Sequence, residues 1–189
     1  MNILLLLSDN DILRRYIVMN AFDGTLTSLG ILIAMRLAGV TDVRLILISA
    51  IGVVFATGIS GVWGAYLVEK AERKHELAEL HKLNPRENLE ERRKEFKRLT
   101  YLMGLANGAS SMMVGLIVLI PYFLANVGLL PLDTAFQYSL ILILGILILI
   151  GSATAKIAHE SRVKHALATI GAACFVGLVL LAFELLKFI

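Results

Sequence analysis

The sequence has a single cysteine, Cys174, and only three prolines among its 189 residues. One cysteine excludes an intrachain disulfide framework and a cage of cysteine metal ligands. Because Cys174 lies in an apolar run, we expect it to be a small, buried helix residue. Motifs for enzyme chemistry are also missing: we recognise no phosphate-binding loop, no histidine metal motif and no nucleophile–base pair. The sequence therefore does not indicate an enzyme.

Charged residues make up 17% of the chain, and hydrophobic residues make up 58%. The mean hydropathy of +0.79 and this apolar share lie well above the values of soluble domains, whose apolar share is about 45–50%. We predict an all-α integral membrane protein with five transmembrane helices in contact with the lipid bilayer. The expected spans are residues 16–38, 43–68, 99–125, 134–155 and 166–187. Residues 1–15 are expected to form an interfacial segment on the membrane surface.

Residues 69–98 differ sharply from the spans, with ten Lys/Arg, eight Glu and no Asp. Their pattern is helical, and Asn84-Pro85 interrupts it in the middle. Asparagine as an N-cap and proline at the first helical position open a helix well. We therefore expect the second span to continue as a helix outside the bilayer to about Leu83 and then to turn into a second helix that leads to the third span, as a charged helical hairpin. The chain then divides into residues 1–15, 16–68, 69–98 and 99–189.

The distribution of positive charge predicts the orientation. Fifteen Lys/Arg fall on the side that holds the N-terminus and residues 69–98, against three on the other side. The positive-inside rule then makes the N-terminus and the hairpin cytosolic. Because the basic residues gather beside spans, the net charge of +3 does not point to nucleic acid. With no recognisable sorting signal, we expect a prokaryotic plasma membrane.

Asp23 lies inside the first expected span. An ionised aspartate there costs at least ~2.5 kcal/mol, and such residues usually face a cavity or a pathway. We expect a cation or proton site at Asp23; the alternative is a carboxylate satisfied by a hydroxyl or the backbone in a packed bundle. Its candidate partners are oxygens of Thr27, Asn107, Ser110 and Ser111 and sulfurs of Met112 and Met113. Such donors would suit iron or manganese more than magnesium, although methionines in membrane helices are usually packing residues.

Glutamates form the second candidate site. Glu69, Glu72, Glu76 and Glu79 are spaced to lie on one stripe of a helix, and further glutamates and histidines follow nearby. These are Glu87, Glu90, Glu91, Glu95, His75 and His81. Packed together, or against a second subunit, they could hold metal ions. The alternative is a solvated helix with ordinary ion pairs such as Glu69–Arg73 and Glu90–Lys94.

Three segments resemble the VIT1/CCC1 family of vacuolar-type iron and manganese transporters. The first is RRYIVMNAFDGTLTSLGILIAM, which is similar to the family's first helix with its Asp-Gly. The second is ATGISGVWGAYLVEKAE, which is similar to the small-residue second helix that ends in Gly-Glu-Tyr. The third is the closing pair of helices with KIAHESRVK between them.

The resemblance implies a five-helix transporter that forms a homodimer and moves ferrous ion out of the cytosol in exchange for protons. No cofactor would be permanently bound, and Fe²⁺ or Mn²⁺ would be the transported ion. By resemblance, Asp23 is the intramembrane acid, Tyr66 belongs with the pathway, and Glu69, Glu72, Glu76 and Glu79 belong to a metal-gathering hairpin.

Two residues depart from the family pattern. Ala65 replaces the glutamate before Tyr66, and Gly61 replaces the methionine that commonly follows the serine at position 60. The leading interpretation is a metal transporter. The alternative is a non-transporting membrane protein of the same fold, which uses its charged hairpin to bind a partner or lipid.

Overall fold

The structure is a computed structural model that describes residues 3–83 and 89–186, which form five helices and no strand. The helices are α1 (Ile3–Leu37), α2 (Val43–Leu83), α3 (Glu90–Asn126), α4 (Leu132–Ala158) and α5 (Arg162–Leu185). Each of the five is long and apolar enough to cross a membrane. The predicted all-α fold with five candidate spans is therefore confirmed.

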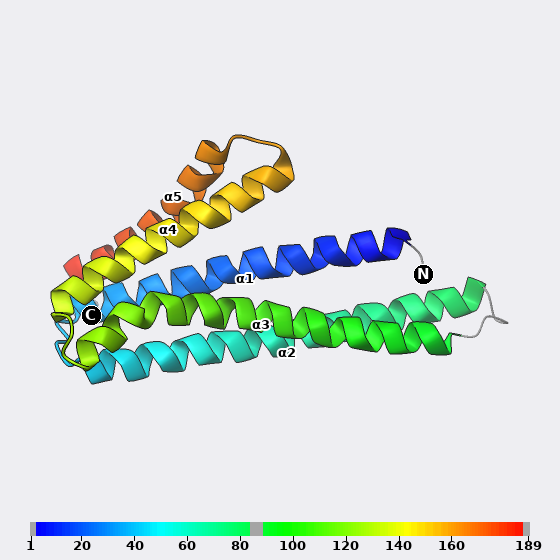
Figure 1. The fold of residues 1–189 in the computed structure, drawn as a ribbon, viewed down its shortest axis with the longest axis horizontal. Coiled ribbons are helices and arrows are strands. Elements are labelled where there is room, and N and C mark those ends of the chain that lie inside the picture. Colours follow the sequence, from blue (N-terminus) through cyan, green and yellow to red (C-terminus); the bar gives the residue numbers. More distant parts are fainter. Residues whose placement is uncertain (1–2, 84–88, 187–189) are drawn as a thin grey trace.

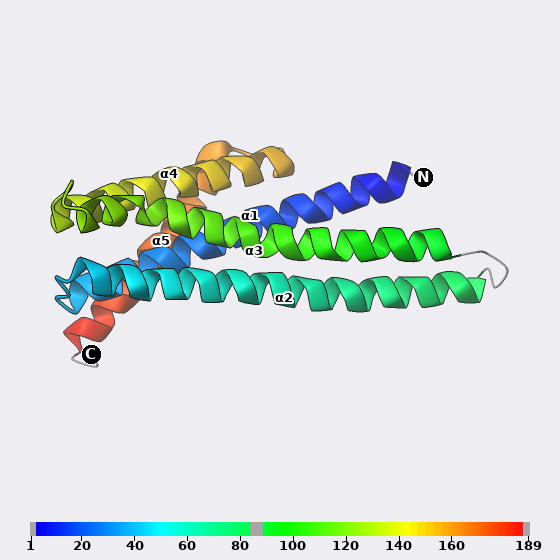
Figure 2. The same ribbon diagram turned by 60° about the horizontal axis from the view of Figure 1, so that its bottom comes forward.

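Three of the helices extend far beyond the membrane spans that the sequence predicts. α2 has 41 residues, which corresponds to about 62 Å at 1.5 Å per residue, and α3 runs beside it along most of its length (Figure 2). α1 continues past the α4–α5 turn in the same direction (Figure 1). It is one continuous helix from Ile3, so the expected boundary at residue 15 is not a helix end.

Glycines end two helices with the same hydrogen-bond pattern. Gly39 has a φ of +68° and Gly128 a φ of +80°, in the left-handed region that residues with a side chain rarely adopt. Beyond α1, the Val40 amide donates to the Met35 carbonyl at 3.1 Å, which is the six-to-one bond of a Schellman motif. α2 then begins beside Asp42, whose carboxylate accepts from the Arg44 amide at 2.9 Å.

The apolar core lies where α1 to α4 meet, away from the charged ends of α2 and α3. Leu32 of α1, Leu119 of α3 and Leu147 of α4 are fully buried there. Ser139 of α4 donates to the Val118 carbonyl of α3 at 2.7 Å. Such hydrogen bonds help to hold helices together in lipid, where apolar burial between helices contributes little.

α1 and α3 cross closely because small residues face one another. A Cβ added to Gly24 would lie 2.5 Å from the Ser111 carbonyl oxygen, and one added to Gly115 would lie 3.3 Å from the Ser28 hydroxyl. The hydroxyls of Ser28 and Ser111 are buried and have no hydrogen-bond partner among the residues that the structure describes. These small residues therefore allow the two helices to approach closely and do not link them by hydrogen bonds.

α5 packs mainly against α4 and leaves most of its surface uncovered. Thr169 donates to the Leu147 carbonyl of α4 at 2.9 Å, and Ala173 is its buried residue. Cys174 is exposed, so the prediction of a buried cysteine is wrong for the single chain. The reason is that α5 lies at the edge of the bundle, where few helices surround it.

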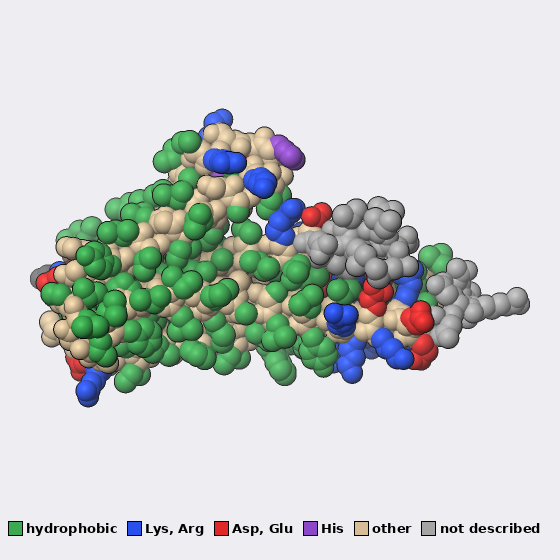
Figure 3. Space-filling view, viewed as in Figure 1, with side chains coloured by type: hydrophobic (Ala, Val, Ile, Leu, Met, Phe, Trp, Pro, Cys, Tyr) green, Lys and Arg blue, Asp and Glu red, His purple; other side chains and the backbone are tan. Residues whose placement is uncertain are grey.

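Charge gathers at the far ends of α2 and α3. Figure 3 shows an apolar surface over the bundle and the largest group of blue and red side chains at the end formed by α2 and α3. The structure thus continues both spans into two neighbouring charged helices, which we call the extension (residues 69–83 and 90–98). The predicted Asn84-Pro85 cap lies outside the described residues.

Candidate functional site

Two buried asparagines connect three helices near Asp23. The Asn20 side-chain amide of α1 donates to Asn107 Oδ1 of α3 and, at 3.2 Å, to the Tyr16 carbonyl. The Asn107 amide donates to the Gly61 carbonyl of α2 at 2.8 Å. Buried amides need such partners, and together they fix the spacing of α1, α2 and α3 at this level.

Asp23 lies beside this network in an open groove of about 470 Å³. Among the described residues, the Asp23 carboxylate makes no ion pair and no hydrogen bond, and it is exposed in the single chain. The groove is formed mainly by one face of α2 opposite α1. Its lining residues are Asn20, Asp23, Ala56, Thr57, Ser60, Gly61, Gly64, Ala65 and Asn107. We call it the Asp23 groove.

The Asp23 groove offers oxygen donors and no sulfur. Its side chains supply one carboxylate, from Asp23, together with the hydroxyls of Thr57 and Ser60 and the amides of Asn20 and Asn107. Carboxylate, carbonyl and hydroxyl oxygens suit hard divalent cations, including Mn²⁺. One carboxylate is few for a tight site, so the groove fits a cation that binds briefly and keeps part of its water shell.

Both positions that depart from the family pattern line this groove. A Cβ on Gly61 would lie 3.3 Å from the Asn107 amide nitrogen and 3.5 Å from Asn20 Oδ1. The two amides therefore occupy the space into which a methionine at position 61 would begin to extend. At Ala65, a methyl group stands where the family has a carboxylate, which leaves Asp23 as the one acid lining the groove.

The other predicted pathway residues do not all reach the groove. Asn107 lines it, whereas the Ser110 hydroxyl donates within its own helix to the Asn107 carbonyl at 2.8 Å. Met112 packs against Gly58, where an added Cβ would lie 2.1 Å from the methionine Cγ. Met113 is 61% exposed, and neither methionine lines the groove. Their expected role as sulfur ligands stays a prediction, and the single chain gives it no support.

Tyr66 also lies outside the Asp23 groove. Its ring packs between Trp63, at 6.0 Å between centroids, and Tyr101 of α3, at 5.2 Å. It lines a second groove between α2 and α3, in the extension. The predicted pathway residues are thus divided between two places, one at Asp23 and one at the base of the extension.

Three of the four glutamates on the α2 stripe form ion pairs. The Glu69 carboxylate is buried, accepts a hydrogen bond from the Tyr16 hydroxyl at 3.0 Å and lies 3.6 Å from Arg73. Glu76 pairs with the same arginine at 3.5 Å, and Glu79 pairs with Lys82 at 2.7 Å. The expected Glu69–Arg73 pair is therefore confirmed.

The remaining candidate ligands do not gather into a site. Glu72, Glu90 and Glu91 are exposed, and Glu87 lies outside the described residues. Within residues 3–83 and 89–186, no three His, Cys, Asp or Glu side chains come together as metal ligands would. A metal-gathering role for the hairpin stays a prediction.

Sequence reasoning missed Asn20. It lies three residues before Asp23 and therefore on the same face of α1, and a polar amide within an apolar span is itself a signal. Pairing Asn20 with Asn107 from the sequence would have required knowing that α1 and α3 cross at this level.

Comparisons with known proteins match the part of the chain that holds Asp23. The model of the VIT family matches residues 14–103, which include Asp23, every lining residue of the Asp23 groove except Asn107, and the whole extension. An uncharacterized protein of Methanocaldococcus jannaschii is 26% identical over 174 residues, which are 90% of this chain and 87% of that protein. The third segment of the resemblance, between α4 and α5, lies outside the residues that the family model matches. The match confirms the resemblance over residues 14–103, where the chain is similar to the VIT family.

Proposed function

We propose that the protein carries divalent metal ions across the membrane through the Asp23 groove, exporting them from the cytosol in exchange for protons. The observation that carries the proposal is an unpaired carboxylate in an oxygen-lined groove of a membrane-spanning helix. An ionised acid facing lipid is costly, and a bound cation would remove that cost. The match to a family of metal transporters supports this interpretation.

The donor set favours a hard cation as substrate. Every side-chain donor in the groove is an oxygen or an amide, and such donors suit Mn²⁺, whereas thioether and thiolate donors select softer ions. We therefore propose that Mn²⁺ is carried at least as well as Fe²⁺. Because a proton and a metal ion compete for one carboxylate, protonation of Asp23 would release the ion on the far side.

We also propose that two copies act together. Asp23 is exposed in the single chain, in a segment that is expected to cross lipid. A second copy that covers the groove would shield this carboxylate and add a second one, which compensates in part for Ala65. Two carboxylates facing each other would bind a divalent ion better than one.

The proposal is tested by metal flux into proteoliposomes that contain a manganese- and iron-sensitive dye. We expect wild-type protein to carry Mn²⁺ down its gradient, faster with an opposing proton gradient. Asp23→Asn keeps the shape of the side chain and removes its charge, so flux should fall at least tenfold, on the order of 1.4 kcal/mol of lost stabilisation.

Asp11→Asn is the matched control. It makes the same substitution on the same helix, where Asp11 forms an exposed pair with Arg14 at 3.0 Å, and exposed pairs contribute little. Flux should stay within twofold of wild type. If folded wild-type protein carries no metal under any gradient, the non-transporting alternative is favoured. Equal flux in wild type and Asp23→Asn would rule out this pathway.

A further inference from the structure

The second groove, between the two helices of the extension, is strongly basic. It has a volume of about 700 Å³, and five Lys or Arg side chains and one histidine line it without any carboxylate. The basic residues are Lys70, Arg73 and Lys74 of α2, Arg93 and Lys97 of α3, and His81 of α2. This absence of acid is unexpected, because the hairpin around the groove contains eight glutamates.

Within the described part of the chain, most of this positive charge has no counter-ion. Arg73 is buried, pairs with Glu69 and Glu76, and lies over the Phe96 ring at 5.0 Å. Among the described residues, no ion pair engages Lys70, Lys74, Arg93 or Lys97. Four like charges around one hollow repel each other, so an anion bound between them would be favoured.

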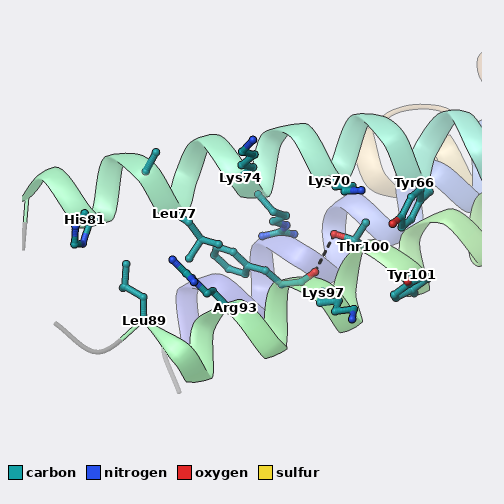
Figure 4. Close-up of a pocket in the computed structure, with 13 residues that line it drawn as sticks. Tyr66, Lys70, Lys74, Leu77, His81, Leu89, Arg93, Lys97, Thr100 and Tyr101 are labelled. Carbon is teal, nitrogen blue, oxygen red and sulfur yellow. Dashed lines mark hydrogen bonds between the residues drawn. The ribbon is translucent and has the colours of Figure 1, made fainter. Parts of the chain in front are cut away.

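Aromatic side chains close the membrane end of the groove. Tyr66 and Tyr101 stack at 5.2 Å, Trp63 adjoins Tyr66, and Lys70 lies over the Tyr66 ring at 5.5 Å. Figure 4 shows Lys70, Lys97, Tyr66 and Tyr101 together at one end, with His81 at the other. Aromatic residues with one polar end are typical of the membrane–water interface.

The position of this cluster matches the headgroup layer. On this side of the membrane, the second expected span ends at residue 68 and the third begins at residue 99. Lys70 lies about 6 Å along the helix axis from Tyr66, away from the membrane, and Lys97 lies equally far from Tyr101. A headgroup layer is roughly 5–8 Å thick on each side of the hydrocarbon core. Leu102 and Leu105, which follow Tyr101 on α3 towards the membrane, are exposed apolar side chains.

We propose that this basic groove binds the phosphate of an anionic phospholipid. Lys70 and Lys97 hold the headgroup phosphate, Lys74 and Arg93 add positive charge around it, and the acyl chains follow the apolar side chains below Tyr66 and Tyr101. A lipid is favoured over a free phosphate or a phosphorylated peptide because the charge and the aromatic cluster meet where headgroups lie. The proposal does not depend on metal transport.

The single tryptophan, Trp63, makes the proposal measurable. The full-length protein is reconstituted in zwitterionic bilayers that contain a small fraction of brominated phosphatidylglycerol, whose bromine atoms quench a neighbouring tryptophan. We expect quenching well above that given by the same fraction of brominated phosphatidylcholine. Equal quenching by the two lipids would overturn the proposal.

A pair of double variants separates the groove from general surface charge. Lys70→Gln with Lys97→Gln removes two charges from the groove, and Lys94→Gln with Arg98→Gln removes two exposed charges at similar depth that do not line it. A basic residue near an anionic bilayer contributes about fivefold in affinity. We therefore expect the preference for the anionic lipid to fall at least about fivefold further in the groove variant than in the control.

Three other outcomes would contradict binding of an anionic lipid in the groove. Equal loss in both variants would mean general attraction without a site. Displacement of the brominated lipid by millimolar inorganic phosphate would assign the groove to a free anion, and displacement by a phosphorylated peptide would assign it to a protein partner. Unchanged circular dichroism in both variants establishes that the comparison is between folded proteins.

Discussion

At the scale of single residues, Glu69 shows how its surroundings decide the role of a carboxylate. Its stripe on α2 is what a metal site would need, but its oxygens face Tyr16 and Arg73 inside the extension. Glu72, one turn further along, is exposed. A buried acid with a cation and a hydroxyl as partners is a structural element, whereas an exposed acid is available to solvent.

Glu69→Gln should therefore destabilise the extension, and Glu72→Gln should not. The first change removes one of the two glutamates that pair with buried Arg73, the other being Glu76. Weakening a buried ion pair costs about 1–3 kcal/mol, whereas an exposed change costs within about 0.5 kcal/mol. Amide hydrogen exchange over residues 70–83 measures the difference. Equal protection in both variants would contradict the structural role, and loss of Mn²⁺ binding without loss of protection would favour metal binding.

The sequence identifies candidate site residues better than it predicts where their side chains point. Asp23 and Asn107 were identified because polar groups are conspicuous in an apolar span, and both line one groove. Met112 and Met113 follow Asn107 closely in sequence but leave the groove, one onto Gly58 and the other outward. Which face of a helix packs against a neighbour depends on how the two helices cross, and the sequence of one span does not reveal that.

At the scale of helices, close crossings depend on a few glycines. A Cβ on Gly108 would lie 2.2 Å from the Gly58 carbonyl oxygen and 2.8 Å from the Val62 amide nitrogen, and one on Gly24 would meet the Ser111 backbone. The obstructing atoms are backbone atoms, which cannot rotate away. α3 is therefore held against both α1 and α2 by the absence of side chains at these two positions.

Gly24→Ala and Gly108→Ala should each push α3 from a neighbour and reduce thermal stability in detergent, with overpacking costs of about 1–3 kcal/mol. Gly145→Ala on α4 is the control, because nothing lies within 4 Å of its added Cβ; alanine there should be neutral or stabilise the helix by up to about 1 kcal/mol. The loss of folded, monodisperse protein on heating measures the effect. If all three variants melt together, the crossings are not limited by these glycines.

The predicted continuation of the second span to about Leu83 is confirmed, because α2 ends at Leu83, whereas the start of the first span at residue 16 is not a helix end. α2 begins at Val43 as expected, because Asp42 caps it. The hairpin helices continue the spans without a break, since neither glycine nor proline interrupts residues 65–83. Hydropathy marks where a helix leaves lipid, whereas its end depends on caps and turns, so the two limits need not coincide.

At the scale of the whole molecule, the single chain leaves exposed the Asp23 carboxylate, a charge that is costly to place in lipid. Asp23 lies in an open groove of a bundle whose surface is otherwise apolar over the spans (Figure 3). Closed symmetric dimers place the same patch of both copies face to face. A dimer across the Asp23 groove would bring the two carboxylates to one site and would put the exposed face of α2 at the interface.

This arrangement predicts which cysteines will cross-link. In a Cys174→Ser background, Ser60→Cys places a thiol on the exposed rim of the Asp23 groove, and in membranes it should give a product of twice the chain mass with a short bismaleimide. Ile141→Cys, which is 61% exposed on α4 and does not line the groove, should give little product. Mn²⁺ between the two carboxylates should raise the yield at position 60, and Asp23→Asn should remove that increase. Cross-linking at position 141 but not at position 60 would place the interface elsewhere and leave each Asp23 groove to work alone.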